Sequence, residues 1–355
     1  DCRVDARSVL AAGTNFTAAY HAMDDRETQE TIAGFYLRNC PELAFRAPRP
    51  GNGRAGRKRI RVGFVSTHFY NHTIAKLYRG IIATLDRTRF QVLVFSTRAP
   101  EDELGRYLEQ VSDEFVVIPE RLQPARDALA GAALDILFYT DIGMASLTYF
   151  LAFARLAPVQ CVGWGHLVST GIPNVDYFIS AMDLENADPG LAQAQYSERL
   201  IRLAHPPTYL FATGPGAEAP APDLAFAKGK HLYACPQPPF KIHPDFDTLL
   251  LQILERDADG VLAFIDSHGA WSATLRRRWE AQAPDLARRI HFVPRMRQDG
   301  FLKLLQASHC ILDSLYVSGG MSSAETLGAG KAVVTLPDAS RAVGRVTYGY
   351  YRQIG

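Results

Sequence analysis

Four short stretches of the sequence combine residue types that could do chemistry. The first, GGMSSAETLGAG (319–330), places Gly319 and Gly320 ahead of a predicted helix that begins near Ser322. Glycine lets the backbone approach a ligand closely, and a helix N-terminus directs N–H groups and its positive dipole end at an anion, so a diphosphate would fit there. The same residues match a capping box, in which Ser322 and Glu325 satisfy each other's backbone groups. Both interpretations stay open at this point.

The second stretch is CPQPPFKIHPD (235–245), where a predicted strand ends and prolines keep the chain extended. Lys241 lies just before a helix whose start is marked by Pro244 and Asp245. A lysine at the end of a strand can serve as a point charge for phosphate, although a lone lysine can equally be solvated. Gln237 is unspecific on its own.

The third stretch, WGHLVSTGIPNVDYF (164–178), is dense in Gly, Ser, Thr and His between two predicted strands. Loops of this composition bind ligands in some proteins and form plain turns in others. His166, Ser169 and Thr170 are the polar side chains that could line a binding site here.

The fourth stretch, FVSTHFYNHTIAKL (64–77), ends a predicted strand and places His68 and His72 four residues apart. Two histidines at this spacing could share a helix face and bind a metal, but no third ligand has a suitable spacing and the glutamate of HExxH is absent. We therefore expect no metal. A neutral imidazole also suits a general base, a hydrogen bond to substrate, or a satisfied position in the core, and these alternatives stay open.

The elements that must position these residues follow from the hydrophobic pattern. Short apolar strands alternate with amphipathic helices, which is typical of parallel sheets covered on both faces. The first series of strands and helices is expected at 59–66, 74–85, 91–97, 104–113, 115–119, 124–133, 134–141, 160–166 and 176–181. The second series, which also contains a basic helix, is expected at 231–235, 245–256, 261–267, 290–294, 301–308, 309–314, 324–330 and 332–337. The pattern predicts two doubly wound α/β domains facing a cleft, and ligands of such sheets collect beyond the carboxyl ends of the strands.

The domain boundaries follow from changes in composition. Residues 1–45 are expected to form helices, and the Pro-, Gly- and Arg-rich stretch 46–58 reads as a linker. The first α/β domain is expected at 59–212, and a second linker at 213–229 contains the Pro/Ala/Gly segment TGPGAEAPAPD. The second domain is expected at 230–355. The chain lacks an initiator Met and stops without an obvious helix ending, so we expect a fragment whose last domain is truncated.

Composition excludes several classes of protein. Of 355 residues, 47% are hydrophobic and 21% charged, and the formal net charge of +1 supplies no basic surface of the kind that nucleic acid requires. No apolar run is long enough to span a membrane. Five widely spaced cysteines without a CxxC pair fit reduced thiols, from which we expect a cytoplasmic protein.

Taken together and in order, several motifs resemble the catalytic region of the O-GlcNAc transferase family over roughly residues 59–355. These motifs are RVGFVSTHFYNHT, LAPVQCVGWGHLVSTGIPNVDYF, QYSERLIRL, FKIHPDFD, ILDSLYVSGGMSSAETLGAGKAVVTLP and GRVTYGYYRQIG. The resemblance implies a GT-B fold, two Rossmann-like domains with a UDP-sugar bound mainly by the second. It also implies inverting transfer without a metal or other cofactor, to Ser or Thr of a protein and less often to Asn. A transferase acting on a glycan or small molecule, or a sugar-nucleotide-binding module without turnover, remains the alternative. The N-terminal helices would end a tetratricopeptide-repeat array.

The resemblance also assigns roles to residues at matching positions. His72 falls on a histidine of the active site, proposed in the family as a base or as a contact to acceptor and donor, and Lys241 on the lysine that contacts the donor phosphates. The turn of Gly320, Ser322 and Ser323 falls on the segment that holds the diphosphate, and Glu325 on the carboxylate that binds ribose. The donor-binding set is completed by Gln237, Gly319, Met296, Gln298 and Phe301, of which Met296 and Gln298 lie where the backbone reads uracil.

The sequence departs from the family pattern at several of these positions. His68 stands where the animal enzymes have Asp, Pro238 replaces a polar residue, and Gly320-Met321 replaces a His-Thr pair. Phe301 also replaces a histidine that packs near the nucleotide. These differences leave the transferred sugar, GlcNAc or a hexose, undecided.

Overall fold

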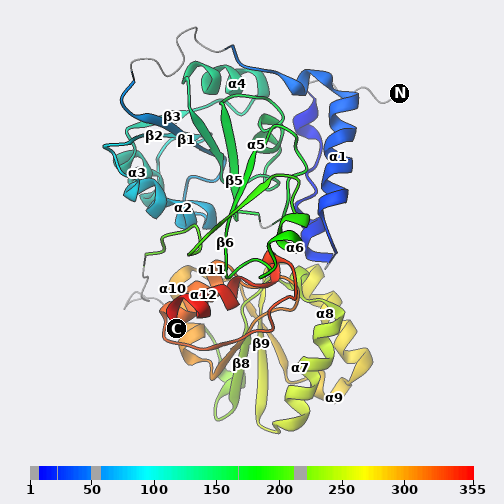
Figure 1. Cartoon of the computed structure of the whole chain (residues 1–355). Coiled ribbons are helices and arrows are strands. Elements are labelled where there is room, and N and C mark those ends of the chain that lie inside the picture. The colour runs from blue at the N-terminus through cyan, green and yellow to red at the C-terminus, as the bar shows by residue number, and fades with distance from the viewer. Residues whose placement is uncertain (1–7, 22, 49–56, 167, 212–221) are drawn as a thin grey trace. The chain divides into compact units, whose positions relative to one another are not determined.

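The structure is a computed structural model that describes residues 8–21, 23–48, 57–166, 168–211 and 222–355. Contacts divide the chain into two compact units, shown in Figure 1. Unit 1 comprises Asp1–Ala19 and Met23–Phe211, and unit 2 comprises Tyr20–Ala22 and Ala212–Gly355. Each unit has a sheet of its own, and the two are described in turn.

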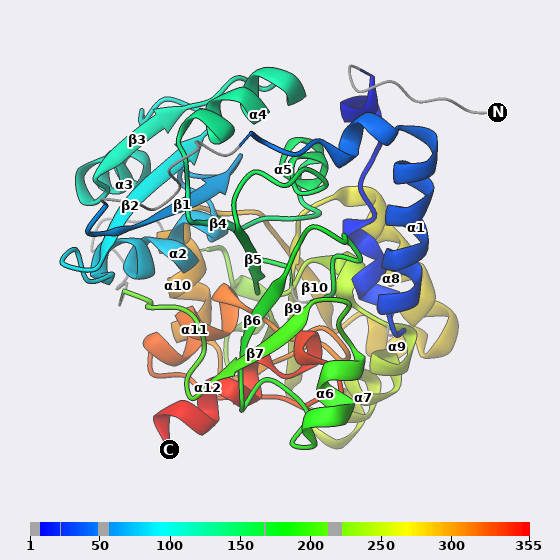
Figure 2. The same ribbon diagram turned by 45° about the horizontal axis from the view of Figure 1, so that its top comes forward.

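Unit 1 is built on a seven-stranded parallel sheet in the order β3-β2-β1-β4-β5-β6-β7. Its strands are β1 (Ile60–Ser66), β2 (Phe90–Ser96), β3 (Glu114–Val117), β4 (Ile136–Tyr139), β5 (Val159–Gly163), β6 (Tyr177–Ala181) and β7 (Arg199–Leu203). The last five residues of β1 and of β2 are all buried, as expected for strands covered on both faces. Figure 2 shows β6 and β7 side by side at one edge of this sheet, where they pair in parallel.

The helices that follow the strands cover this sheet. They are α2 (Thr73–Thr84), α3 (Glu103–Val111), α4 (Leu122–Gly131), α5 (Ser146–Leu151) and α6 (Pro189–Ala194). Helix α2 buries Ile74, Leu77 and Tyr78, spaced three and four residues apart as on one face of a helix. Each fully buried Leu or Phe stabilises the fold by roughly 2 kcal/mol, and Leu93, Phe95 and their neighbours form the core.

The N-terminal residues of unit 1 form fewer helical turns than expected. Helix α1 (Arg26–Asn39) is present, whereas the described stretch before it contains only the 3₁₀ turns η1 (Val9–Ala11) and η2 (Phe16–His21), with η3 (Pro41–Ala44) after α1. The last two residues of η2, Tyr20 and His21, belong to unit 2. Part of the predicted first helix, residues 1–7, lies outside the described residues. Residues 49–56 of the expected first linker also lie outside them, as do residues 213–221 of the expected second linker.

Unit 2 is built on a five-stranded parallel sheet in the order β10-β9-β8-β11-β12. Its strands are β8 (His231–Cys235), β9 (Gly260–Asp266), β10 (Ile290–Pro294), β11 (Cys310–Leu312) and β12 (Val333–Val334). The α-helices are α7 (Pro244–Arg256), α8 (Gly269–Gln282), α9 (Pro284–Ala287), α10 (Gln298–Ala307), α11 (Met321–Gly328) and α12 (Val346–Ile354). Short 3₁₀ turns complete the unit as η4 (Ala225–Ala227), η5 (Pro239–Lys241) and η6 (Ala342–Gly344).

In both sheets the first strand of the series lies inside the sheet, the next two strands are added on one side of it, and the remaining strands are added on the other side. This order defines a doubly wound α/β unit. The predicted fold class, two Rossmann-like doubly wound domains, is therefore confirmed. Elements that the pattern did not predict are short or peripheral, namely α5, α6, β7, α9 and α12. No helix in the described ranges is both long and apolar enough to cross a membrane.

Candidate functional site: a lysine, a glutamine and a helix start in unit 2

Three of the predicted donor-binding residues contact one another at the carboxyl edge of the unit 2 sheet. The Lys241 Nζ donates to Gln237 Oε1 at 3.2 Å and to the Ser318 carbonyl at 3.3 Å. The Gln237 side chain, only 3% exposed, donates in turn from Nε2 to Ser322 Oγ at 2.9 Å. Burial lowers the pKa of Lys241, and the nearby Asp313 opposes this shift. The structure thus joins Lys241, Gln237 and the first turn of α11 in one polar cluster.

Helix α11 begins without the capping box that its sequence allowed. The N-cap residue is Gly320, which has no side chain to offer, and Ser322 and Glu325 bond elsewhere. Glu325 Oε1 accepts from Gln298 Nε2 at 2.9 Å, and among the described residues no side-chain hydrogen bond caps the start of this helix. The capping-box interpretation is therefore wrong. The start of α11 carries the partial positive charge of a helix N-terminus next to Lys241.

Position 319 has no room for a side chain larger than that of glycine. A Cβ atom at this position would collide with Ser323 Oγ, Gln237 Nε2 and Ser322 Oγ. Around Gly320, by contrast, the space for a Cβ atom is open. Ser323 is 2% exposed and its hydroxyl shares a 2.7 Å hydrogen bond with Thr347 Oγ1, so this side chain supports the turn from inside.

Asp313, which sequence reasoning did not single out, organises the same loop. It follows β11 and is 5% exposed. Its Oδ1 accepts from the backbone N–H groups of Ser314 and Gly319, and its Oδ2 accepts from the Thr335 and Thr347 hydroxyls. Burial raises the pKa of this carboxyl, opposed by these hydrogen bonds and by Lys241. The signal that could have found it is an acidic residue placed directly after a buried strand.

The remaining predicted donor residues lie at the β10–α10 connection. Met296 and Phe301 pack against one hydrophobic core cluster of unit 2. Gln298 begins α10 and reaches Glu325. The structure brings Gln298 together with Glu325, and the reading of uracil by this backbone stays a prediction.

In unit 1, His68 and His72 stack on each other at the carboxyl end of β1. Their ring centroids are 4.4 Å apart at an interplanar angle of 23°. His72 is the N-cap of α2, and its Nδ1 accepts from the Ile74 N–H at 3.2 Å. Because an N–H donor faces Nδ1, the neutral ring must carry its proton on Nε2.

The surroundings keep both imidazoles neutral at physiological pH. Burial and the neighbouring His68 lower the pKa of His72 to about 4, while the Asp141 carboxylate opposes this shift. Burial and Arg98 lower the pKa of His68. Asp141 is fully buried, and its Oδ2 lies 3.9 Å from His68 Nε2 and accepts from Ser66 and Thr67. The described residues contain no group of three or more His, Cys, Asp or Glu that could hold a metal ion.

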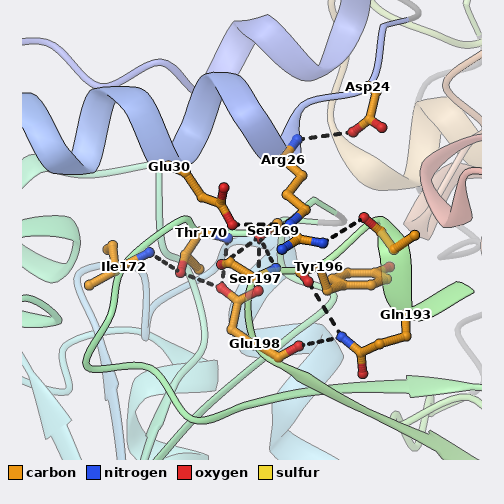
Figure 3. Close-up of polar contacts among 11 residues, drawn as sticks. Asp24, Arg26, Glu30, Ser169, Thr170, Ile172, Gln193, Tyr196, Ser197 and Glu198 are labelled. Atoms are coloured by element: carbon orange, nitrogen blue, oxygen red, sulfur yellow. Dashed lines mark hydrogen bonds and ion pairs between the residues drawn. The ribbon is translucent and has the colours of Figure 1, made fainter. Parts of the chain in front are cut away.

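The loop after β5 places its predicted side chains inside unit 1. His166 Nε2 lies 3.1 Å from the Phe16 carbonyl and its ring packs on Phe16, and burial lowers its pKa to about 4. Figure 3 shows Ser169 and Thr170 gathered at the Glu198 carboxylate, and both are at most 5% exposed. These hydrogen bonds give Ser169 and Thr170 a structural role in the loop, and a role in lining the acceptor site stays a prediction for them.

The fold and the unit 2 cluster define an α/β chain of the GT-B class with a site suited to an anionic ligand. No protein-family model matches the chain. It is similar to a solved O-GlcNAc transferase mutant of Thermobaculum terrenum, with a TM-score of 0.77 and 25% identity over 95% of this chain and 65% of that one.

Two curated proteins agree with this likeness. A probable UDP-N-acetylglucosamine–peptide N-acetylglucosaminyltransferase, SEC, of Arabidopsis thaliana is 23% identical over 355 residues, covering 93% of this chain and 35% of the relative. The UDP-glucose:protein N-beta-glucosyltransferase of Actinobacillus pleuropneumoniae is 26% identical over 142 residues, covering 38% of this chain and 21% of the relative. The resemblance to the O-GlcNAc transferase family is confirmed. The chain spans about a third of the length of the first of these curated relatives.

Proposed function

We propose that this chain transfers a sugar from a UDP-sugar to a protein, with inversion and without a metal ion. The observation that carries the proposal is the cluster of Lys241, Gln237 and the start of α11 in unit 2. A diphosphate brings negative charge, and a half-buried ammonium group beside a helix N-terminus can neutralise it. The names of the two curated relatives support a UDP-sugar donor and a protein acceptor.

The reaction class determines what unit 1 must supply. A Ser or Thr hydroxyl would attack the anomeric carbon, the bond from that carbon to the UDP oxygen would break, and the hydroxyl proton would pass to a phosphate oxygen of the departing UDP or to water. We propose that His72 is a hydrogen-bond donor to substrate through Nε2–H, because its Nδ1 is occupied by the Ile74 N–H. Asn is the less favoured acceptor residue.

Calorimetry with UDP and with uridine tests the donor assignment. A hydrogen bond from an ammonium group to phosphate contributes about 1.5–3 kcal/mol, so Lys241→Ala should weaken UDP binding by roughly 10- to 150-fold. The variant should leave uridine binding nearly unchanged. Lys228→Ala is the matched control, since it removes one positive charge from an exposed position of the same unit. Failure of the wild-type chain to bind UDP at millimolar concentration would end the donor assignment.

Mass spectrometry of host proteins co-expressed with the chain tests the acceptor. Added masses on Ser or Thr, lost in the Lys241→Ala variant, are the expected result and would also identify the sugar. Sugar found only on a glycan or a small molecule would favour the alternative acceptor class.

A further inference from the structure

We propose that Phe240 and Trp271 form a platform in unit 2 that binds the ring of a sugar. The platform rests on the proposed function, because it would serve the sugar of the donor or a sugar already attached to the acceptor. In both cases the ligand is a hexopyranose ring.

Phe240 and Trp271 are large aromatic side chains that remain partly exposed to solvent. Phe240 is 39% exposed and Trp271 is 43% exposed, whereas Trp164 and Trp279 are at most 3% exposed. The Phe240 and Trp271 rings are in contact, with centroids 5.1 Å apart and nearly perpendicular planes. They therefore form one continuous aromatic surface.

The topology places this surface beside the donor cluster. Phe240 lies in η5 after β8, and Trp271 lies in the first turn of α8 after β9. Strands β8 and β9 pair in parallel, so both aromatic residues lie at the carboxyl edge of the sheet. Phe240 directly precedes Lys241, whose ammonium group we assign to the donor phosphates.

Polar aromatic groups border the platform. The His268 ring lies 4.6 Å from Trp271, and Tyr20, a residue of the same unit, lies 4.9 Å from Phe240 and 5.8 Å from the Lys241 ammonium. A sugar ring presents C–H groups on one face and hydroxyls around its rim. An aromatic face carries negative charge density that attracts such C–H groups, and the neighbouring imidazole and phenol can bond hydroxyls. A perpendicular ring pair offers no parallel-walled slot for a flat nucleobase.

Quenching of tryptophan fluorescence by acrylamide tests the platform directly. Of the three tryptophans, Trp271 is the accessible one, so it should contribute most of the quenching, and Trp271→Phe should remove that fraction. We expect a saturating UDP-sugar, or a short oligosaccharide of N-acetylglucosamine added with UDP, to lower the quenching constant of Trp271 at least twofold. UDP alone should leave it unchanged. Protection by the UDP-sugar identifies the donor sugar as the ligand, and protection by the oligosaccharide identifies an acceptor sugar.

Other outcomes overturn the platform. Protection by UDP alone would assign the rings to the nucleotide, and an unchanged quenching constant with every sugar, while UDP still binds by calorimetry, would remove the sugar altogether. Loss of UDP binding itself would instead contradict the proposed function, and the free oligosaccharide still tests the platform in that case. Trp271→Ala should weaken the protecting sugar about three- to tenfold. Phe35→Ala, which removes a 44% exposed aromatic ring from unit 1, should not.

Discussion

Substitutions of His72 can separate the hydrogen bond that its Nδ1 accepts from Ile74 from the one that we propose its Nε2–H donates to substrate. The amide of Asn reaches the position of Nδ1, and the longer side chain of Gln reaches the position of Nε2. Asparagine can accept the Ile74 N–H as Nδ1 does, but its amide ends short of the position of Nε2. Glutamine can present an N–H near the position of Nε2, but it cannot accept a proton and is a poor helix cap. Alanine loses both functions.

The expected magnitudes distinguish a donor from a base. Loss of one hydrogen bond to a neutral substrate group costs about 0.5–1.5 kcal/mol, which lowers transfer roughly 2- to 13-fold, whereas loss of a general base costs about 10²- to 10⁴-fold. His72→Gln should therefore keep most of the transfer activity, and His72→Asn and His72→Ala should lose about an order of magnitude. The cap contributes about 1 kcal/mol, so His72→Ala and His72→Gln should lower the melting temperature of a unit of roughly 200 residues by about 2–4 °C.

The pH dependence of stability provides a second measurement with a definite sign. The pKa of His72 is about 4 in the folded chain, whereas an unfolded histidine titrates near pH 6.5. Below about pH 6.5 the His72 imidazole therefore binds a proton in the unfolded state but stays neutral in the folded state. The wild type should lose stability relative to His72→Asn as the pH falls from 6.5 to 4. Single-turnover transfer to an acceptor found by mass spectrometry and thermal melts at pH 7 and 5 are the assays. If His72→Gln lowered the rate of transfer by 10²-fold or more, as the loss of a general base does, the donor role would be refuted.

Three further predictions concern other positions. Gly319→Ala should abolish measurable UDP binding in calorimetry, because the added Cβ atom collides with Gln237 and displaces the start of α11; unchanged affinity would contradict the tight fit. Ala133→Gly should raise the melting temperature of unit 1, because Ala133 has a φ of 48° just after α4, where left-handed backbone favours glycine by about 1 kcal/mol. UDP affinity should decline at alkaline pH below the usual lysine pKa, since burial lowers the pKa of Lys241 and the ammonium loses its charge earlier; isothermal titration from pH 7 to 10 checks this, and the decline should be smaller in Lys241→Ala, where the uracil N3–H of the ligand still titrates but the ammonium is gone.

The sequence predicted the strands and helices whose hydrophobic residues form a long apolar run or recur with a clear helical period. The apolar runs of β1, β2 and β9 and the amphipathic faces of α2 and α7 follow directly from the pattern of buried residues. Short elements escaped because a few residues cannot display a period, as in α6 with six residues. Elements of this length are decided by tertiary packing.

The residues of the candidate site could be predicted from the sequence, but the hydrogen bonds between them could not. Lys241, Gln237 and Ser322 could be named from motif and strand-end placement, but the hydrogen bond from Gln237 to Ser322 joins segments 85 residues apart in sequence. The capping box failed for the same reason, since Gln237 and Gln298 compete for the Ser322 and Glu325 side chains. Asp313 was missed because its partners, such as Thr347, are distant along the chain.

His72 is at once the last residue before α2 and a candidate contact for substrate. A side chain tied to the Ile74 N–H has already given up its rotamer freedom when the chain folds. Binding substrate through the opposite nitrogen would therefore not require further ordering of this residue, and the entropy cost that a free surface histidine incurs on binding would have been met during folding. The stability of one helix end would in this way set how tightly unit 1 can bind its ligand.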